Sequence, residues 1–366
     1  MESAGAPVIG LMSGTSLDGV DAALVDFSQA FPRTLATFWL PYPDDIRHRA
    51  LDLQAAGPDE LHRGALLANA LAGCYADAVR QLLAGAAVAA DRVAAIGCHG
   101  QTIRHQPAAG YTIQLNNPAL LAELTGIAVV ADFRSRDIAA GGQGAPLVPA
   151  FHAAMFGDPL RHRVILNLGG IANLTDLSPG RPVRGFDCGP GNLLLDAWIE
   201  RHQGRRYDEG GHWAARGTVL PQLLQRLLED PFFAAGPPKS CGRDEFNLDW
   251  LERRLAGGEL AEDVQATLLE LTAVSVVEAI GRWCGRPQEV FVCGGGARNQ
   301  ALMARLRQHL PDCRVAGTDF LGQPADWVEA VAFAWLAWRA LRGEAGNLAE
   351  VTGARGARIL GAIYPR

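Results

Sequence analysis

The chain of 366 residues is 49% hydrophobic and 20% charged, with a formal net charge of −6 at pH 7. Such a composition is typical of a soluble globular protein, and the length suffices for about two domains with their own cores. Because the balance is acidic and no Lys/Arg-rich run occurs, we expect neither a nucleic-acid partner nor a membrane partner.

The cysteines and the first residues of the chain indicate in which cellular compartment the protein is expected. No basic segment followed by an apolar core opens the chain, and no apolar run approaches the roughly 20 residues of a membrane-spanning helix. The 7 cysteines are scattered and show neither a disulfide framework nor CxxC spacing. We therefore predict a reduced, cytoplasmic protein, and no metal site built from protein ligands alone.

Lysine occurs once, as Lys239. A phosphate-binding loop of the form GxxxxGKS or GxxxxGKT is therefore excluded. If the protein binds ATP, then backbone amides, hydroxyl groups, arginines and a metal ion must hold the phosphates.

Residues 8–26 are predicted to form a strand, a turn rich in glycine and hydroxyl groups, and a second strand. Gly14 and Gly19 let a ligand approach the main chain closely, and Ser13, Thr15 and Ser16 add hydroxyl groups. Successive backbone N–H groups in such a turn form a concave site suited to phosphate oxygens. An ordinary hairpin turn is the alternative.

A short buried strand at residues 93–97 leads directly into the polar residues His99, Gln101 and Thr102. Open α/β sheets bind ligands beyond the carboxyl ends of their strands, so we predict a binding loop here. A structural histidine is the alternative. The other elements predicted in this half are strands at residues 34–40, 111–115 and 127–130, and helices at residues 59–84 and 118–124.

Residues 131–137 form a charge cluster between an apolar strand and the glycine loop at residues 141–146. Arg134 and Arg136 there could bind a carboxylate or a phosphate in fork geometry, whereas a solvated face is the alternative. The chain is expected to cross between domains here. We therefore predict domains at 1–130 and 131–344, with a C-terminal helix at about 345–366 rejoining the first.

The second half repeats the strand, glycine turn and strand of the first half. Residues 164–175 again read as strand, glycine turn and strand, with Asn167, Gly169 and Gly170 at the turn. One polar glycine hairpin near the start of each half predicts two similar domains that grip one polyphosphate between them.

Asp187 lies where a predicted strand meets a glycine-proline turn and the start of a helix. Its carboxylate could cap that helix, or it could act as a general base near the phosphate-binding elements. Further on, a strand at residues 289–293 runs into Gly294, Gly295 and Gly296, which suit a nucleotide base or ribose lying against the backbone. The remaining segments are predicted as loops at residues 205–217 and 231–243, a buried helix at residues 264–280, and a helix carrying Glu329 at residues 327–341.

In this order, the motifs resemble the superfamily of sugar kinases, actin and chaperone ATPases, and more narrowly the anhydro-N-acetylmuramic acid kinases. The resemblance covers nearly the whole chain. It rests on the segments at residues 10–21, 99–102, 132–137, 141–146, 186–192, 293–299 and 329–337.

The resemblance implies an α/β fold of two actin-like ATPase domains of the ribonuclease H-like type, with duplicated mixed sheets and an interdomain cleft. It also implies the substrates ATP, water and 1,6-anhydro-N-acetylmuramic acid, with Mg²⁺, and the products ADP and N-acetylmuramic acid 6-phosphate, in cell-wall sugar recycling. Asp187 would deprotonate a water that attacks the anomeric carbon, and the oxygen of the opened bridge would receive the γ-phosphoryl group. The family also implies a homodimer.

The resemblance assigns the remaining site residues. The residues implied to bind the nucleotide are Gly14, Thr15, Ser16, Leu17, Asp18, Gly19, Val20, Asp21, Asn167, Gly169, Gly170, Gly189, Gly294, Gly295, Gly296 and Asn299. Arg134 is implied to bind the lactyl carboxylate of the sugar, and the other residues implied at the sugar are His99, Gln101, Asp137 and Glu329.

Three positions depart from the family pattern. Met12 stands where many sugar kinases carry an aspartate, so Mg²⁺ handling would fall to Asp18, Asp21 or Asp187 through water. Cys188 stands where we expect threonine, and Ser135 replaces an expected arginine.

Two other functions are compatible with the same motifs. An actin-like or chaperone-like ATPase would share the nucleotide hairpins, but it should carry a polymer surface or a peptide-binding module, and no such module is apparent. A kinase for another amino sugar is the alternative within the same class. A glycosidase with paired carboxylates would leave the phosphate hairpins unexplained.

Overall fold

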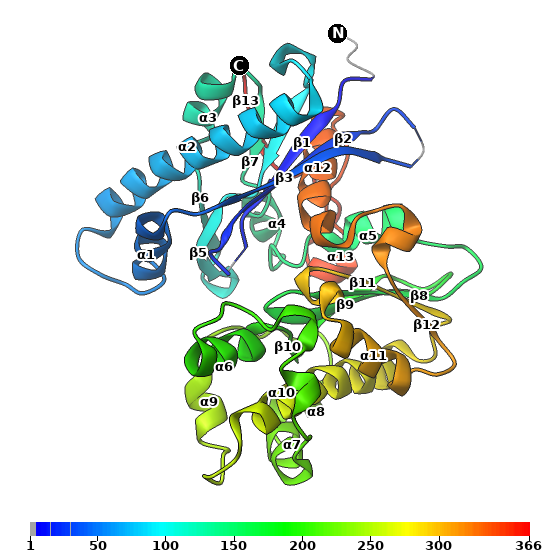
Figure 1. The fold of residues 1–366 in the computed structure, drawn as a ribbon. Helices are drawn as coiled ribbons and strands as arrows, with labels where there is room; N and C mark the ends of the chain where they lie inside the picture. Colours follow the sequence, from blue (N-terminus) through cyan, green and yellow to red (C-terminus); the bar gives the residue numbers. More distant parts are fainter. Residues whose placement is uncertain (1–4, 15, 30) are drawn as a thin grey trace. The chain divides into compact units, whose positions relative to one another are not determined.

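The computed structural model describes residues 5–14, 16–29 and 31–366, so Thr15 lies outside the described residues. The chain divides into two compact units (Figure 1). Unit 1 comprises Met1–Met155 and Trp327–Arg366, and unit 2 comprises Phe156–Asp326. These bounds differ from the expected domains, because residues 131–155 and 327–344 belong with unit 1.

A mixed sheet forms the centre of unit 1. Strands β1 (Val8–Met12), β2 (Gly19–Asp26) and β3 (Arg33–Pro41) form an antiparallel meander, in which Met12 pairs with Asp21. On the other side of β1, strand β4 (Ala95–Cys98) is parallel to β1, and β7 (Val129–Ala131) is parallel to β4. The strand order is β13-β7-β4-β1-β2-β3.

Two long helices cover the faces of this sheet. Ile9 and Leu11 of β1 pack with α2 (Glu60–Ala86) in one apolar core. Gly10 points to the other face, since side chains alternate along a strand, and a Cβ there would overlap the carbonyl of Ala330 in α12 (Val328–Leu341). Helix α12 therefore packs closely on unit 1, and this contact explains why the chain returns to unit 1 earlier than expected.

The C-terminal segment is not the predicted helix at about 345–366. It forms a single turn, α13 (Ala349–Thr352), and a short strand, β13 (Ala362–Tyr364), which pairs antiparallel with β7. Gly353, with φ +78°, ends the turn, because its left-handed conformation cannot continue a helix. The remaining elements of unit 1 are α1 (Asp44–Asp52), β5 (Gln101–Gln106), β6 (Tyr111–Leu115), α3 (Pro118–Thr125), α4 (Ser135–Ala139) and α5 (Val148–Phe156).

Unit 2 repeats the topology of unit 1. Strands β8 (Arg163–Leu168), β9 (Ile171–Leu177) and β10 (Arg184–Pro190) form the meander, and β11 (Glu289–Cys293) and β12 (Arg314–Gly317) follow in parallel on the other side of β8. The strand order is β10-β9-β8-β11-β12. The duplicated mixed sheet confirms the predicted ribonuclease H-like fold class, whereas the predicted cleft stays a prediction.

Helix α10 (Ala261–Ala279) is the centre of the unit 2 core. With the turn that follows, residues 261–284 are long and apolar enough to cross a membrane, but 78% of the apolar window is buried inside the protein. The predicted loop at residues 231–243 includes α8 (Pro231–Ala234), and the loop at residues 205–217 includes two short 3-10 turns. The other helices of unit 2 are α6 (Leu193–Gln203), α7 (Pro221–Leu228), α9 (Leu248–Glu252) and α11 (Gln300–His309).

Candidate active site

The predicted polar residues of unit 1 follow three neighbouring strands. Strands β1, β4 and β7 are parallel, so residues 13–14, 16–18, 99–101 and 132–134 all come at the same edge of the sheet. The edge at the carboxyl ends of the strands is where α/β sheets bind ligands. The sheet thus brings the first hairpin turn, the His99 loop and the Arg134 cluster together.

The first hairpin turn is held in a strained conformation. Leu17 has φ +57°, although its side chain is buried, and its N–H donates to the carbonyl of Gly14 at 3.3 Å. Ser16 donates from Oγ to Oδ1 of exposed Asp18 at 2.6 Å. A left-handed, non-glycine residue costs energy, and such residues cluster at ligand-binding turns. The second part of the motif differs: Val20 is fully buried in β2, so its side chain is not available to a ligand.

Gln101 holds this turn from behind. Its fully buried amide donates from Nε2 to the carbonyl of Gly14 at 3.1 Å, and Tyr42 donates to its Oε1 at 3.5 Å. Ser13 completes the network, with Oγ 2.9 Å from the hydroxyl of Tyr75 and donating to the carbonyl of Gly100 at 3.0 Å. We therefore assign Gln101 to positioning the turn. Sequence reasoning missed both tyrosines, because neither the apolar pattern of α2, which carries Tyr75, nor the turn after β3, which carries Tyr42, shows where a hydroxyl group will bond.

His99 and Arg134 form one hydrogen-bonded pair. Arg134 reaches Nε2 of His99 from Nη2 at 2.9 Å and from Nε at 3.2 Å, and Nη1 donates to the carbonyl of Gly144 at 2.7 Å. Burial, and then the charge of Arg134, lower the pKa of His99 to about 3, so the imidazole is neutral. Burial lowers the pKa of Arg134 to about 10, opposed by Glu329 and Asp137, and the guanidinium stays charged at neutral pH.

Glu329 lies in the first turn of α12, in the same electrostatic environment. Burial raises the pKa of its carboxyl, and the charge of Arg134 lowers it. Nδ1 of His99 is buried and has no hydrogen-bond partner among the described residues. An arginine, a neutral imidazole and a buried carboxyl are suited to a substrate that carries both a carboxylate and hydroxyl groups.

Asp137 is fully buried, and protein groups occupy both of its oxygens. Oδ1 accepts from Nδ2 of Asn347 at 2.6 Å and from the hydroxyl of Thr352 at 2.7 Å, and Oδ2 accepts from the N–H of Gly144 at 2.8 Å. The carboxylate thus ties the glycine loop to the C-terminal segment. We assign Asp137 to anchoring these segments, and it stays only a prediction as a sugar ligand.

In unit 2, the second glycine turn and the start of α6 are joined directly. The N–H of Gly191 donates to the carbonyl of Gly170 at 2.9 Å, and the N–H of Asn192 donates to the carbonyl of Gly169 at 2.8 Å. Nδ2 of Asn192 also donates to the carbonyl of Leu168 at 3.1 Å. The turn and the Asp187 segment are therefore one structure at the carboxyl edge of the unit 2 sheet.

The predicted nucleotide glycines fall into two groups. A Cβ at Gly294, which has φ +80°, would reach within 2.8 Å of the carbonyl of Leu168, and a Cβ at Gly296 would reach within 3.0 Å of the same oxygen. These glycines are required for the triple-glycine segment to pack on the second turn. A Cβ at Gly170 or Gly295 would meet nothing within 4 Å, so there is open space beside both residues.

Two further predicted residues have packing roles in unit 2. Asn299 caps α11, with Oδ1 accepting from the N–H of Leu302 at 3.0 Å, so that oxygen is already used. Gly189 has φ +140°, and a Cβ there would lie 2.7 Å from the ring of Phe233. Asn299 therefore fixes the start of α11, and Gly189 permits the close packing of Phe233.

Asp187 is the predicted catalytic carboxylate at the carboxyl edge of the unit 2 sheet. It does not cap α6, whose N-cap is Asn192. Instead its Oδ2 accepts from the N–H of Cys241 at 3.0 Å, and its own N–H donates to the carbonyl of Lys239 at 3.1 Å. Burial raises the pKa of Asp187 to about 6, opposed by the Cys241 N–H and by the charge of Lys239. A base with a pKa slightly below neutral is suited to accept a proton at pH 7.

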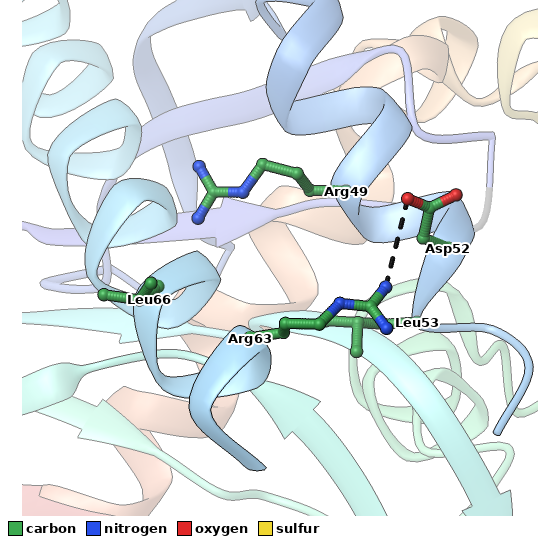
Figure 2. Close-up of a pocket in the computed structure, with 5 residues that line it drawn as sticks. All are labelled: Arg49, Asp52, Leu53, Arg63 and Leu66. Atoms are coloured by element: carbon green, nitrogen blue, oxygen red, sulfur yellow. Dashed lines mark ion pairs between the residues drawn. The ribbon is translucent and has the colours of Figure 1, made fainter. Parts of the chain in front are cut away.

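Two further observations concern metal ligands and a pocket away from the predicted residues. Within residues 5–14, 16–29 and 31–366, no group of three or more His, Cys, Asp or Glu side chains is placed to hold a metal ion. Unit 1 contains a pocket of about 360 Å³. Figure 2 shows its lining, in which Arg63 pairs with Asp52. The residues lining it are Arg49, Asp52, Leu53, Arg63 and Leu66, and none of them is a predicted site residue.

Known proteins resemble the chain over its whole length. The model of the family described as anhydro-N-acetylmuramic acid kinase matches residues 6–366. An anhydro-N-acetylmuramic acid kinase of Thiobacillus denitrificans is 59% identical over 363 residues, which cover 98% of this chain and 97% of that protein. Another, of Nitrosospira multiformis, is 58% identical over 359 residues, which cover 98% of both chains. Among solved structures, the activator of the 2-hydroxyisocaproyl-CoA dehydratase from Clostridium difficile with bound ADPNP has a TM-score of 0.47 and 12% identity, covering 92% of this chain and 96% of that chain.

Proposed function

The chain belongs to the family of anhydro-N-acetylmuramic acid kinases, which makes it an ATP-binding kinase of amino-sugar metabolism, and we propose that it acts on 1,6-anhydro-N-acetylmuramic acid in cell-wall sugar recycling. The reaction consumes ATP, water and the anhydro sugar, and it yields ADP and N-acetylmuramic acid 6-phosphate. One observation carries the proposal: a partly buried carboxylate with a raised pKa, Asp187, lies in the segment that is bonded to a phosphate-type glycine turn.

In the proposed mechanism, Asp187 accepts a proton from a water molecule. The water oxygen forms a bond to the anomeric carbon, and the bond from that carbon to the bridging oxygen breaks. The freed oxygen attacks the γ-phosphorus, and the bond from that phosphorus to the β,γ-bridging oxygen breaks, so that ADP leaves. A carboxylate with a pKa of about 6 is deprotonated at neutral pH and can be reprotonated in each cycle.

We propose that the glycine turns bind the phosphates through backbone N–H groups. Gly170 and Gly295 have open space where a side chain would be, which supports a close approach of ATP there. Gly294, Gly296 and Gly189 support the site by permitting its packing. In the first turn, residues 14–21 serve the same purpose, with Leu17 setting its shape.

Mg²⁺ would be held chiefly by the phosphates and by water. The described residues contain no cluster of three ligands, and Mg²⁺ bound to nucleotides typically takes one or two carboxylates from the protein. Asp18, which is exposed in the first turn, fits that need, and Asp21 is the other candidate, since Asp187 is proposed as the base. When bound, the ion would offset charge on the transferred phosphoryl group.

For the sugar, we propose that Arg134 binds the lactyl carboxylate. Its guanidinium is charged, and the neutral imidazole of His99 holds its orientation. His99 Nδ1 and the Glu329 carboxyl are proposed to contact the sugar hydroxyl groups, because each is buried and Nδ1 has no partner among the described residues. We further propose a cytoplasmic homodimer, to be tested by the mass of the protein in solution.

The test is ADP release with Mg-ATP and three acceptors: the anhydro sugar, intact N-acetylmuramic acid and 1,6-anhydro-N-acetylglucosamine, which lacks the lactyl group. The proposal expects turnover on the first only, and its loss in Asp187→Asn. Turnover on the intact sugar would make the protein a plain hydroxyl kinase for another amino sugar. ATP hydrolysis that needs no sugar would favour an actin-like ATPase.

A further inference from the structure

We propose that Lys239 is a positioning residue for Asp187: its ammonium group pins the segment at residues 239–241, which holds the carboxylate in place. The inference rests on the proposed role of Asp187 as the base. It assigns a role to Lys239 and to the loop at residues 231–243, for which the sequence predicted no function.

The segment bonds Asp187 at two points. The carbonyl of Lys239 accepts from the Asp187 N–H at 3.1 Å, and the Cys241 N–H donates to Oδ2 at 3.0 Å. The backbone and the carboxylate of Asp187 are therefore both bonded by residues two apart in a stretch without regular secondary structure. If the segment moves, the carboxylate loses a donor, and its orientation and its pKa both change.

The Lys239 side chain fastens the segment to α8. Its Nζ donates to the carbonyl of Phe232 at 2.9 Å and lies 4.3 Å from the centre of the Phe232 ring. Helix α8 is fixed in turn, because Asp230 accepts from the Phe232 N–H at 3.0 Å and from the Trp250 indole N–H at 2.8 Å. The chain of contacts thus runs from the core of unit 2 to Asp187.

The residue type supports the assignment. Lys239 is one lysine among 33 basic residues, so this chain uses arginine at every other basic position. A compact ammonium can donate to a carbonyl while it lies over a ring, whereas the planar guanidinium fork suits carboxylates and phosphates. Arginine at position 239 should therefore keep the charge and fit the carbonyl less well.

Charge adds to the effect. The groups that act on the Asp187 carboxyl are Lys239 and the Cys241 N–H, which lower its pKa, and Glu245, which raises it. Arg282 acts in turn on Lys239. Because Nζ donates to Phe232 rather than to the carboxylate, we expect loss of the lysine charge to raise the pKa of Asp187 by on the order of half a unit, less than a directly paired charge would.

The single lysine provides a probe that does not depend on activity. Protein grown with [¹³C]lysine carries the label at one residue, so the ε-carbon signal of Lys239 can be followed through pH. We expect an inflection near pH 6, which Asp187→Asn abolishes and Glu245→Gln leaves in place. A signal without an inflection between pH 5 and 7 would overturn the inference, and it would do so whether or not the protein phosphorylates the sugar.

Variants then test the kinetic consequence. In Lys239→Gln the acid limb of kcat/KM should move to higher pH by about half a unit, which is roughly a twofold loss at pH 6 from protonation alone. Imperfect positioning should lower kcat further at every pH while KM for ATP stays unchanged. Lys239→Arg should keep the acid limb of the wild-type kcat/KM profile. Melting temperatures identify a variant that fails to fold. A wild-type profile and kcat in folded Lys239→Gln would overturn the proposal, whereas an inactive wild type would overturn only the proposed function.

Discussion

Arg134 donates to Nε2 of His99 from Nη2 at 2.9 Å, and this pair joins the loops that follow two different strands of unit 1. The guanidinium is charged and the imidazole is neutral, since burial and Arg134 both lower the pKa of His99. The histidine is thus a neutral support that orients a cation. A cation oriented in this way is suited to a planar anionic group.

Replacing Arg134 should affect binding of the sugar more than the chemical step. For Arg134→Lys we expect KM for the anhydro sugar to rise by about 10-fold or more, because a point charge does not reproduce a bidentate contact worth about 1.5–3 kcal/mol. Steady-state kinetics with varied sugar at saturating ATP measure this. Arg136→Lys is the matched control, since Arg136 is exposed and in the same cluster. Equal effects in both variants would remove Arg134 from the sugar site.

His99 should make the protein sensitive to acid. Its folded pKa of about 3 lies below the unfolded value of about 6.5, so the unfolded chain takes up the proton first. The free energy of unfolding should therefore fall by roughly 1.4 kcal/mol per pH unit from this group as the pH drops below 6.5. Urea titrations at several pH values should show a shallower decline in His99→Gln than in wild type. The exposed His48→Gln serves as control, and an unchanged slope in His99→Gln would contradict the assignment.

Gln101 should influence ATP rather than the sugar. Its replacement by alanine removes one of the two donors to the carbonyl of Gly14 and the amide oxygen that accepts from the hydroxyl of Tyr42. We expect a loss of about 1–3 kcal/mol in the free energy of unfolding and a higher KM for ATP, with KM for the sugar nearly unchanged. The exposed Gln106→Ala should have no effect on either constant. A rise in KM for the sugar alone would restore Gln101 as a sugar ligand.

Thr352 tests the anchoring role of Asp137. In Thr352→Val the carboxylate loses a hydroxyl donor in a buried place, and thermal unfolding should show a destabilisation of about 1–3 kcal/mol. Thr352→Ser keeps the hydroxyl and should stay near wild type. Both kinetic constants for the sugar should be unchanged in folded protein. A selective change in KM for the sugar would argue that Asp137 contacts it.

The regular elements were largely predictable from local patterns. The apolar runs on either side of the two glycine turns predicted β1, β2, β8 and β9, and the helices predicted at residues 59–84 and 327–341 correspond to α2 and α12. The same patterns placed both glycine turns at strand ends. The fold class was then predicted from the repeated strand, glycine turn and strand, together with the family resemblance.

Long-range hydrogen bonds were not predictable, because no local signal marks them. Asp137 bonds Thr352, which is 215 residues away, and this contact rather than a helix fixes the C-terminal segment. Asp187 is held by residues of a segment that reads only as a polar, proline-containing loop. For both Asp137 and Asp187, the sequence identified a candidate site carboxylate but not the groups that donate hydrogen bonds to it.

The most direct test of the account is the fate of oxygen in the reaction of the anhydro sugar. The reaction is run with Mg-ATP in water enriched in heavy oxygen, and the product is analysed by mass spectrometry and fragmentation. The account predicts one heavy oxygen at the anomeric hydroxyl, none in the phosphoryl group at the sixth oxygen, and no product with Asp187→Asn. A product with no heavy oxygen at the anomeric position, or one that Asp187→Asn still forms at the wild-type rate, would contradict it.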